Sequence, residues 1–330
     1  MKKLSRIPIA HLPTPVEFLP SLTRMCGGPK IFVKRDDQTG LALGGNKARK
    51  LEYLLGEAIS SGADMVITAG AVQSNHCRQT AAAAARCHLE CELVLLGSEP
   101  DQRTGNLLLD GLFGAELRWT RKESRDAELL KAFQEASARG KKPYLIPYGG
   151  SNPVGAAGYV DAMAELVSQW DEKRMENPLP DWIILPSGSG GTQAGMVLGA
   201  RKFRFPGRIL GISVDEPADS LTPRIVRLVD ETAGLLGVDA RGCETDVRVN
   251  SDYLGNGYGV VGAAELEAIR MFARAEGLLL DPVYTGRAAA GMIDLIRKQT
   301  IPPHESVLFW HTGGAPALFA SQYNDALNPA

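Results

Sequence analysis

The 330-residue chain is 44% hydrophobic and 22% charged, and its formal net charge is −2. This length suffices for two domains or one large α/β unit. Acidic and basic residues are mixed along the chain, which argues against a nucleic-acid-binding surface and a polybasic membrane anchor. No apolar run is long enough for a signal peptide or a membrane span. We therefore expect a folded cytoplasmic enzyme whose partners are small molecules.

Cysteine usage argues against two further classes of protein. The five cysteines are Cys26, Cys77, Cys87, Cys91 and Cys243, an odd set without a Cys-x-x-Cys pair. This pattern disfavours both a disulfide framework and a zinc ribbon, so we expect reduced thiols. His88 next to Cys87 comes nearest to a metal site, but a second ligand pair is missing and no metal is predicted.

Short runs rich in Val, Ile and Leu alternate with longer helical patterns. The runs cover residues 31–33, 65–68, 93–96, 144–147, 182–185, 209–214 and 307–310. Such alternation predicts a doubly wound α/β fold whose strands are buried on both faces of mostly parallel sheets. Ligands bind to folds of this class at the carboxyl ends of the strands. The segments that follow the runs are therefore the candidates for a site.

The first of these segments leads to Lys47. Gly44 and Gly45 lie shortly before it, and a helical pattern over residues 48–55 follows. Two glycines let the backbone approach a planar ligand, and a lysine amine can hold a carbonyl cofactor as a Schiff base. Alone, Lys47 could equally be a solvated lysine at a helix start, so the interpretation depends on the other segments.

Polar residues follow the second run. Ser74, Asn75 and His76 precede an alanine-rich helical pattern, so their side chains gather at a helix N-terminus. Free N–H groups and the helix dipole attract anions at such an end. We expect a carboxylate to bind here.

A glycine-rich loop follows the run at 182–185. It consists of Ser187, Gly188, Ser189, Gly190, Gly191 and Thr192, and a helical pattern comes after it. Glycines let successive amides converge on phosphate oxygens, and hydroxyls and the helix dipole add to the attraction. Gln193 occupies the third glycine position of a dinucleotide fingerprint, and the chain has no Walker-type sequence. The loop therefore predicts a phosphate site of another kind.

Hydroxyls stand beside glycines at two further positions. We expect a strand to end before Asp281, ahead of Tyr284 and Thr285, and Thr312 follows the run at 307–310. Either segment alone could be a turn, and Thr312 alone could be a helix cap. Their occurrence together with the loops described above favours a ligand site.

This order of motifs resembles the fold-type-II pyridoxal-phosphate (PLP) enzymes, the tryptophan synthase β group. More narrowly, the chain resembles the D-cysteine desulfhydrase and aminocyclopropane carboxylate (ACC) deaminase family over residues 34–37, 44–52, 73–76, 78–79, 281–286 and 311–319. The resemblance spans nearly the whole chain and implies a homodimer. It also implies two doubly wound α/β domains, a small one over 51–158 and a large PLP-binding one over 1–50 and 159–330.

The family pattern implies roles in binding the cofactor, pyridoxal 5'-phosphate. Lys47 would be the Schiff-base lysine, and Asn75 would contact the ring hydroxyl of the cofactor. The loop at 187–192 would hold the phosphate, and Thr312 would face the pyridine nitrogen.

The same pattern implies roles toward an amino-acid substrate. Ser74, Asn75 and His76 would bind its carboxylate, and Tyr258 and Tyr284 would line the substrate side as catalytic residues. The Lys47 amine or the Ser74 hydroxyl would take the Cα proton, and one of the tyrosines would protonate the leaving group. A core tyrosine with a satisfied hydroxyl is the alternative for either tyrosine.

The reaction depends on Thr285. Deaminases of the family carry a glutamate at this position, after the tyrosine that matches Tyr284, and it protonates the pyridine nitrogen. A threonine beside the substrate leaves the ring a weaker electron sink, which disfavours cyclopropane opening and suits β-elimination. The resemblance therefore implies a carbon–sulfur lyase that releases sulfide from D-cysteine.

The leaving group stays open at this point. L-cysteate would release sulfite, and its sulfonate would need donors such as Arg49, Lys50, Arg78 or Arg287, all of which could equally be solvated or paired. ACC deamination, racemisation, β-replacement and a non-catalytic role as a sensor of amino acids or PLP also stay open.

Overall fold

A computed structural model describes residues 2–172 and 178–327 of the chain. Its strands are β1 (Val16–Phe18), β2 (Lys30–Arg35), β3 (Met65–Ala71), β4 (Glu90–Leu96), β5 (Glu116–Thr120), β6 (Pro143–Leu145), β7 (Trp182–Ser187), β8 (Arg208–Ser213), β9 (Arg248–Asn250) and β10 (Ser306–His311). They form a six-stranded sheet of order β1-β2-β10-β7-β8-β9 and a four-stranded sheet of order β5-β4-β3-β6. Within the described ranges, β1 and β2 pair antiparallel and the other pairs are parallel.

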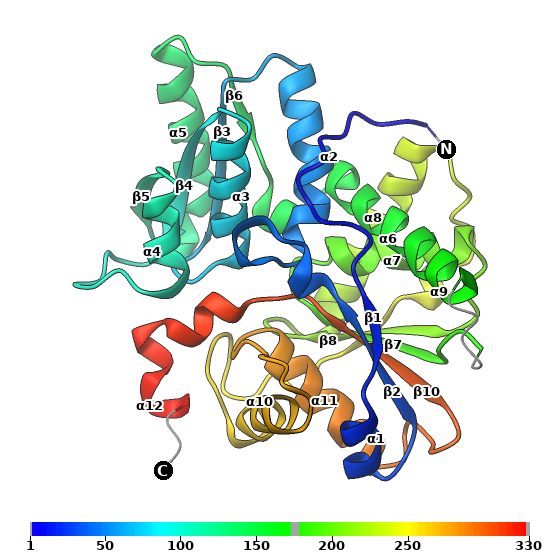
Figure 1. Ribbon diagram of the computed structural model, residues 1–330. Coiled ribbons are helices and arrows are strands. Elements are labelled where there is room, and N and C mark those ends of the chain that lie inside the picture. Colours follow the sequence, from blue (N-terminus) through cyan, green and yellow to red (C-terminus); the bar gives the residue numbers. More distant parts are fainter. Residues whose placement is uncertain (1, 173–177, 328–330) are drawn as a thin grey trace.

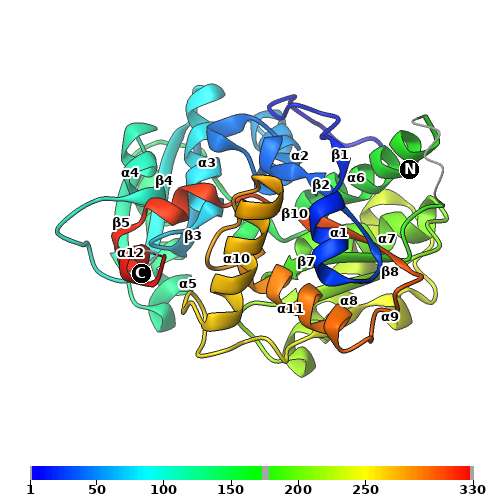
Figure 2. The ribbon, with the colours of Figure 1, turned by 60° about the horizontal axis from the view of Figure 1, so that its bottom comes forward.

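Helices cover both sheets. They are α1 (Pro20–Cys26), α2 (Lys47–Ser60), α3 (Asn75–Arg86), α4 (Gly105–Leu112), α5 (Arg125–Ala138), α6 (Pro153–Glu172), α7 (Gly191–Lys202), α8 (Ala218–Leu236), α9 (Cys243–Asp246), α10 (Ala263–Glu276), α11 (Thr285–Arg297) and α12 (Asn324–Leu327). Figures 1 and 2 show the smaller sheet with α3, α4 and α5 on one side of the molecule and the larger sheet on the other. The strands of the smaller sheet fall within 51–158 and those of the larger sheet outside it, while the domain boundary itself stays a prediction.

The seven apolar runs all form strands, as predicted. The sequence did not reveal β1, β5 and β9, and each of these lies at the edge of a sheet. An edge strand is covered on fewer sides, so it can be short and polar. The pattern of β5, Glu-Leu-Arg-Trp-Thr, is accordingly half-buried at most.

The strand expected before Asp281 is absent. Residues 277–281 have no regular secondary structure, and the chain turns through 282–284 into α11. Asp281 makes this turn, because its carboxylate accepts the backbone N–H groups of Val283, Tyr284 and Thr285. An Asp that binds the backbone two to four residues ahead is a feature of turns and helix starts.

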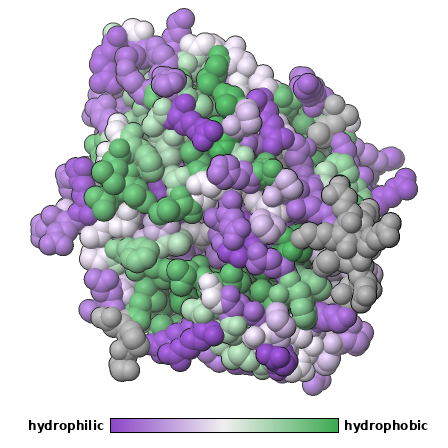
Figure 3. All heavy atoms as spheres, in the orientation of Figure 1, coloured by the Kyte–Doolittle hydropathy of each residue, from purple (hydrophilic) through white to green (hydrophobic). Residues whose placement is uncertain are grey.

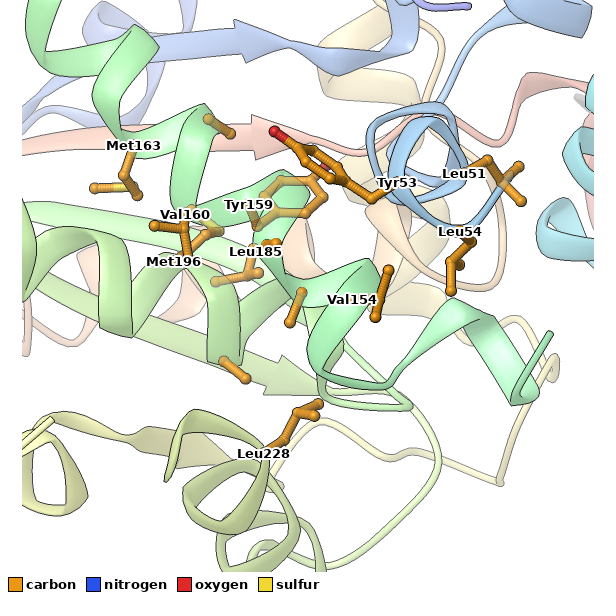
Figure 4. Close-up of a cluster of buried hydrophobic side chains, with 14 of the residues drawn as sticks. Leu51, Tyr53, Leu54, Val154, Tyr159, Val160, Met163, Leu185, Met196 and Leu228 are labelled. Atoms are coloured by element: carbon orange, nitrogen blue, oxygen red, sulfur yellow. The ribbon is translucent and has the colours of Figure 1, made fainter. Parts of the chain in front are cut away.

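A core of apolar side chains joins α2 and α6 to the larger sheet (Figure 4). Leu51 and Leu54 of α2, Tyr159 of α6, Leu185 of β7 and Met196 of α7 belong to one buried cluster. Burying side chains of this size contributes about 1.5–3 kcal/mol each. The helix that begins at Lys47 is thus held by the core along its length.

Two general findings concern the described ranges. No helix there is long and apolar enough to cross a bilayer. No three His, Cys, Asp or Glu side chains there gather as metal ligands would, and the five cysteines are free thiols.

Candidate active site

A cavity of about 290 Å³ lies where the carboxyl ends of strands from both sheets meet. Most of the residues predicted for the site line it: Lys47, Ser74, Asn75, His76, Ser187, Gly188, Ser189, Gly190, Thr192, Tyr258, Tyr284 and Thr312. Gly191 and Thr285 are not among the lining residues. Segments more than 200 residues apart in sequence therefore converge on one space.

Lys47 is the first residue of α2 and faces the carbonyl oxygen of Gly149, to which its amine donates a hydrogen bond of 3.2 Å. Two residues earlier, Gly45 packs closely against Gln79: its φ is +129°, and a Cβ there would lie 2.5 Å from the side-chain nitrogen of Gln79. Burial lowers the pKa of Lys47 to about 8. A large fraction of the amine is therefore neutral and nucleophilic near pH 8.

A buried ionic network fixes the start of α2. The guanidinium of Arg49 donates to the carboxylates of Asp36 (2.9 Å) and Glu165 (2.8 Å). Asp36 also accepts the hydroxyl of Tyr159 at 2.6 Å and the indole N–H of Trp310 at 2.8 Å. Burial opposes ionisation of Asp36, but the charge of Arg49 beside it keeps the pKa of the carboxyl below its usual value. Arg49 is thus paired and does not face the cavity.

Lys50 lies one helical turn after Lys47. It is buried, and its amine is 3.2 Å from both the carbonyl oxygen of Gly149 and the hydroxyl of Ser151. Burial and the neighbouring Lys47 lower the pKa of Lys50 well below its usual value. A Cβ added to Gly191 would lie 3.0 Å from this amine. Lys50 therefore faces the glycine-rich loop, where an anion would favour its charged form.

The glycine-rich loop runs from the end of β7 into α7. Gly190 caps α7 with a φ of +88°, where an added Cβ would lie 2.9 Å from Ile225. The hydroxyl of Thr192 accepts the side-chain amide of Asn46 at 3.1 Å. The hydroxyl of Ser187 is buried and has no hydrogen-bond partner among the described residues. An unpaired buried hydroxyl beside free helix N–H groups fits an anionic ligand.

Ser151 joins this loop, although the sequence did not single it out. Its hydroxyl lies 2.7 Å from that of Ser189 and accepts the backbone N–H of Gly191 at 3.2 Å. The amide of Gly191, predicted for the phosphate, thus already has an acceptor, and Gly191 lies behind the cavity wall. Ser151 follows β6 closely in the chain, so the strand-end rule applied to the run at 144–147 could have identified this segment.

Ser74 caps α3, and its hydroxyl accepts the backbone N–H of Cys77 at 3.2 Å. The backbone N–H groups of Asn75 and His76, in the first turn, have no acceptor among the described residues. Two donors at the positive end of a helix suit a carboxylate.

The imidazole of His76 is bonded to Thr68 and does not offer a hydrogen-bond donor to a carboxylate in the cavity. Thr68 donates its hydroxyl hydrogen to the carbonyl of Ile146 (2.8 Å), so His76 Nε2 carries the hydrogen shared with Thr68 at 2.9 Å. Its Nδ1 is then an acceptor, buried and without a partner among the described residues. Burial and the nearby lysines lower the pKa of His76 well below its usual value. His76 can therefore serve a carboxylate only through its backbone N–H.

Asn75 is oriented by two neighbours. Its Oδ1 accepts from Arg78 Nη1 at 2.9 Å and from Asn106 Nδ2 at 3.1 Å, which leaves its own NH₂ group as a donor. Arg78 is buried and also donates to the Gly44 carbonyl at 2.7 Å. The Arg78 guanidinium thereby ties the segment before Lys47 to the helix that carries Asn75.

Tyr258 and Tyr284 form a pair in the wall of the cavity. Their hydroxyl oxygens are 2.6 Å apart, and their rings meet edge to face. Burial raises the pKa of both hydroxyls far above the usual value, so both remain protonated at neutral pH. Thr312 follows β10 and lines the same cavity.

Thr285 and Arg287 serve the fold instead of lining the cavity. The Thr285 hydroxyl donates to Asp281 at 2.7 Å and is fully buried. Arg287 pairs with Glu265 at 2.9 Å and donates to the backbone carbonyl of Val214 at 3.0 Å. Thr285 is thus not among the residues that line the cavity, because the turn at Asp281 occupies its hydroxyl, and its place beside the substrate stays a prediction.

Comparison with known proteins identifies the family. The sequence model of the family described as pyridoxal-phosphate dependent enzyme matches residues 7–313. The chain belongs to this PLP-dependent family. Its fold is that of the tryptophan synthase β group, with two mostly parallel sheets, as predicted.

Individual PLP-dependent relatives place the chain more narrowly. It is 40% identical over 326 residues to the D-cysteine desulfhydrase of Salmonella typhi, covering 97% of each chain. It is 41% identical over 329 residues to that of Klebsiella pneumoniae (strain 342), covering 97% of this chain and 98% of the other. A solved structure described as an ACC deaminase homologue has 39% identity and a TM-score of 0.89, covering 98% of this chain and 96% of its own. The chain is thus a member of the D-cysteine desulfhydrase and ACC deaminase family.

Proposed function

We propose that this PLP-dependent enzyme is a carbon–sulfur lyase that converts D-cysteine to pyruvate, ammonia and hydrogen sulfide. One observation carries the proposal: among the described residues, Lys47 is the one cation in the lining that is neither at the surface nor paired. The other lining cations are Arg125 and Arg224, which pair with carboxylates, and the exposed Lys122. A cavity lined in this way suits a substrate whose side chain is small and carries no strong negative charge.

PLP fits the cavity. We propose that Lys47 binds its aldehyde carbon, that the NH₂ group of Asn75 donates to the ring oxygen and that Thr312 faces the ring nitrogen. The loop at 187–192 and Lys50 would hold the phosphate, and the buried, unpaired hydroxyl of Ser187 supports this assignment. When bound, PLP withdraws electrons from the bonds at the Cα atom of the substrate.

The protein groups then bind the substrate and transfer protons. The backbone N–H groups of Asn75 and His76 and the hydroxyl of Ser74 would orient the carboxylate. The Lys47 amine, whose pKa is lowered to about 8 by burial, is suited to accept the Cα proton near neutral pH. The Ser74 hydroxyl is the second candidate for this base.

The leaving sulfur gains negative charge, which a hydrogen-bond donor would stabilise. Tyr258 and Tyr284 share a hydrogen bond of 2.6 Å and stay protonated, because burial raises the pKa of both. Either hydroxyl can therefore donate a hydrogen bond to the sulfur as the carbon–sulfur bond breaks, which stabilises the negative charge that develops on the sulfur.

The charges and polar groups around the cavity also favour this reaction over the competing ones. Arg49, Arg78 and Arg287 are buried and bonded within the fold, so these three arginines are not free to bind the sulfonate of L-cysteate. ACC deamination ranks lower, because position 285, where deaminases of the family carry a glutamate, is a threonine whose hydroxyl is bonded to Asp281. A non-catalytic sensor would not need a lysine of lowered pKa.

The test is a panel of four substrates offered to the purified, PLP-loaded protein: D-cysteine, L-cysteine, L-cysteate and ACC. We expect pyruvate and sulfide in equal amounts from D-cysteine, and no turnover by the Lys47→Ala variant. Sulfite from L-cysteate would assign a sulfo-lyase instead, and 2-oxobutyrate from ACC a deaminase. No product from any substrate, despite bound PLP, would favour the sensor.

A homodimer is also proposed. Leu108 and Leu112 of α4 are 47% and 71% exposed, and Phe319 of the neighbouring 3₁₀ helix Ala315–Phe319 is 70% exposed. Figure 3 shows apolar side chains over the part of the surface where α4 lies in Figure 1. Exposed apolar clusters mark contact surfaces. We expect twice the monomer mass in light scattering, and the monomer mass for Leu112→Glu/Phe319→Glu; a monomeric wild type would contradict this.

A further inference from the structure

A second cavity, of about 410 Å³, lies at the opposite end of the larger sheet from the active site. Its charged lining residues are Arg201, Arg204, Arg208, Arg248 and Asp246. They come from the end of α7, the start of β8 and the segment around the start of β9. Figure 1 shows α7 and α9 on the side of the molecule away from the smaller sheet.

Most of the arginines that line this cavity have no carboxylate as an ion-pair partner among the described residues. Arg208 pairs with Glu305 at 3.2 Å and lies over the ring of Trp182. In the ranges that the structure describes, Arg201, Arg204 and Arg248 have no carboxylate within 4.0 Å. Three unpaired, solvent-exposed guanidinium groups beside the one carboxylate of Asp246 leave an excess of positive charge around one concave space.

The end of α7 brings the exposed residue Arg204 to this cavity. Arg204 follows the cap residue Phe203 with a φ of +55°, and the next N–H, that of Phe205, closes onto the Ala200 carbonyl at 2.9 Å. Helices commonly end this way with a glycine in the left-handed position. Here an arginine occupies it, so the turn that ends α7 carries a cation into the lining of the cavity.

We propose that this cavity binds a small anion that carries phosphate. Guanidinium groups donate parallel pairs of N–H bonds to phosphate oxygens and keep their charge at every physiological pH. The three unpaired guanidinium groups and the carboxylate of Asp246 leave an excess of about two positive charges, which a phosphate group would neutralise. The site is independent of the proposed reaction, since none of its residues lines the active-site cavity.

The two cavities share a helix. α7 begins at the glycine-rich loop and ends at Arg201 and the turn to Arg204. Gln193, which lines the active-site cavity, donates its side-chain amide to the carbonyl of Arg248 at 2.6 Å. An anion in the second cavity would thus contact elements that also hold the active site.

Calorimetric titration with inorganic pyrophosphate tests the proposal. The PLP-loaded protein is used, so that the glycine-rich loop is filled, in buffer containing about 0.15 M salt. The Arg201→Ala/Arg248→Ala variant should bind at least tenfold more weakly than the wild type. The matched control, Arg86→Ala/Arg274→Ala, removes two exposed arginines that lie outside this cavity and should bind within twofold of the wild type.

Several outcomes would overturn the proposal. Equal affinity of the wild type and Arg201→Ala/Arg248→Ala, or no detectable binding of pyrophosphate at millimolar concentration, would exclude this cavity as the site. An equal loss in the control variant would indicate a general charge effect. A parallel titration with citrate separates phosphate from carboxylate ligands, and citrate binding as tight as pyrophosphate binding would refute the phosphate assignment.

Discussion

Replacing Arg78 by methionine should lower both stability and cofactor retention. Arg78 makes hydrogen bonds to Asn106 Oδ1 (2.7 Å), the Gly44 carbonyl (2.7 Å) and Asn75 Oδ1 (2.9 Å). Methionine keeps most of the buried volume but leaves the first two acceptors unpaired, while Asn75 keeps its bond from Asn106. At about 1–3 kcal/mol for each unpaired buried group, the loss is about 2–6 kcal/mol.

Urea unfolding of the apoprotein measures this loss without a contribution from cofactor binding. Because Asn75 loses one of the two bonds that orient it, we also expect PLP to dissociate at least fivefold faster from Arg78→Met. Arg86→Met, on the exposed face of the same helix, should change stability by less than about 0.5 kcal/mol. A loss below 1 kcal/mol in Arg78→Met, with unchanged PLP retention, would refute the reasoning.

Three further outcomes are expected. Burial raises the pKa of Asp110 to about 8, so the folded state keeps a proton that the unfolded state loses near pH 4. Stability should therefore fall between pH 4 and pH 8 by up to about 1.4 kcal/mol per pH unit, and urea unfolding of Asp110→Asn should show a flatter profile; an unchanged slope would contradict this. The rate at which the apoprotein binds PLP covalently, followed by absorbance, should rise with pH with a midpoint near 8, as the lowered pKa of Lys47 requires, and a midpoint near 10 would contradict this shift. Arg49→Met leaves the buried Asp36 without its cation and should cost about 3–5 kcal/mol in urea unfolding, whereas a cost below 1 kcal/mol would show that the pair adds little.

Much of the fold was predictable because strands covered on both faces must be apolar. Each apolar run found in the sequence is a strand, and β1, β5 and β9 were missed because edge strands escape that requirement. The prediction of a strand before Asp281 was wrong for another reason. Apolar residues such as Leu278 and Leu280 are buried there without being paired in a sheet, and periodicity does not distinguish the two cases.

The candidate site was predictable where function depends on backbone conformation. Gly45 and Gly190 have φ angles that favour glycine, and sequence alone located both loops. Side-chain direction was not predictable: Thr285 bonds to Asp281, and His76 bonds to Thr68. Ser151 was missed because a serine after two glycines is also typical of an ordinary turn.

The buried arginines that were candidates for binding a sulfonate have a structural role in this protein. Arg49, Arg78 and Arg287 lie within helices on buried faces, where a charge is tolerated only with partners, and each is bonded to groups that position the cavity wall. Hydroxyl groups, in contrast, line the cavity itself. Removing one of these charges should therefore lower stability and cofactor retention before it alters substrate preference. Removing a hydroxyl, such as that of Tyr284, should lower the rate of carbon–sulfur cleavage while PLP remains bound.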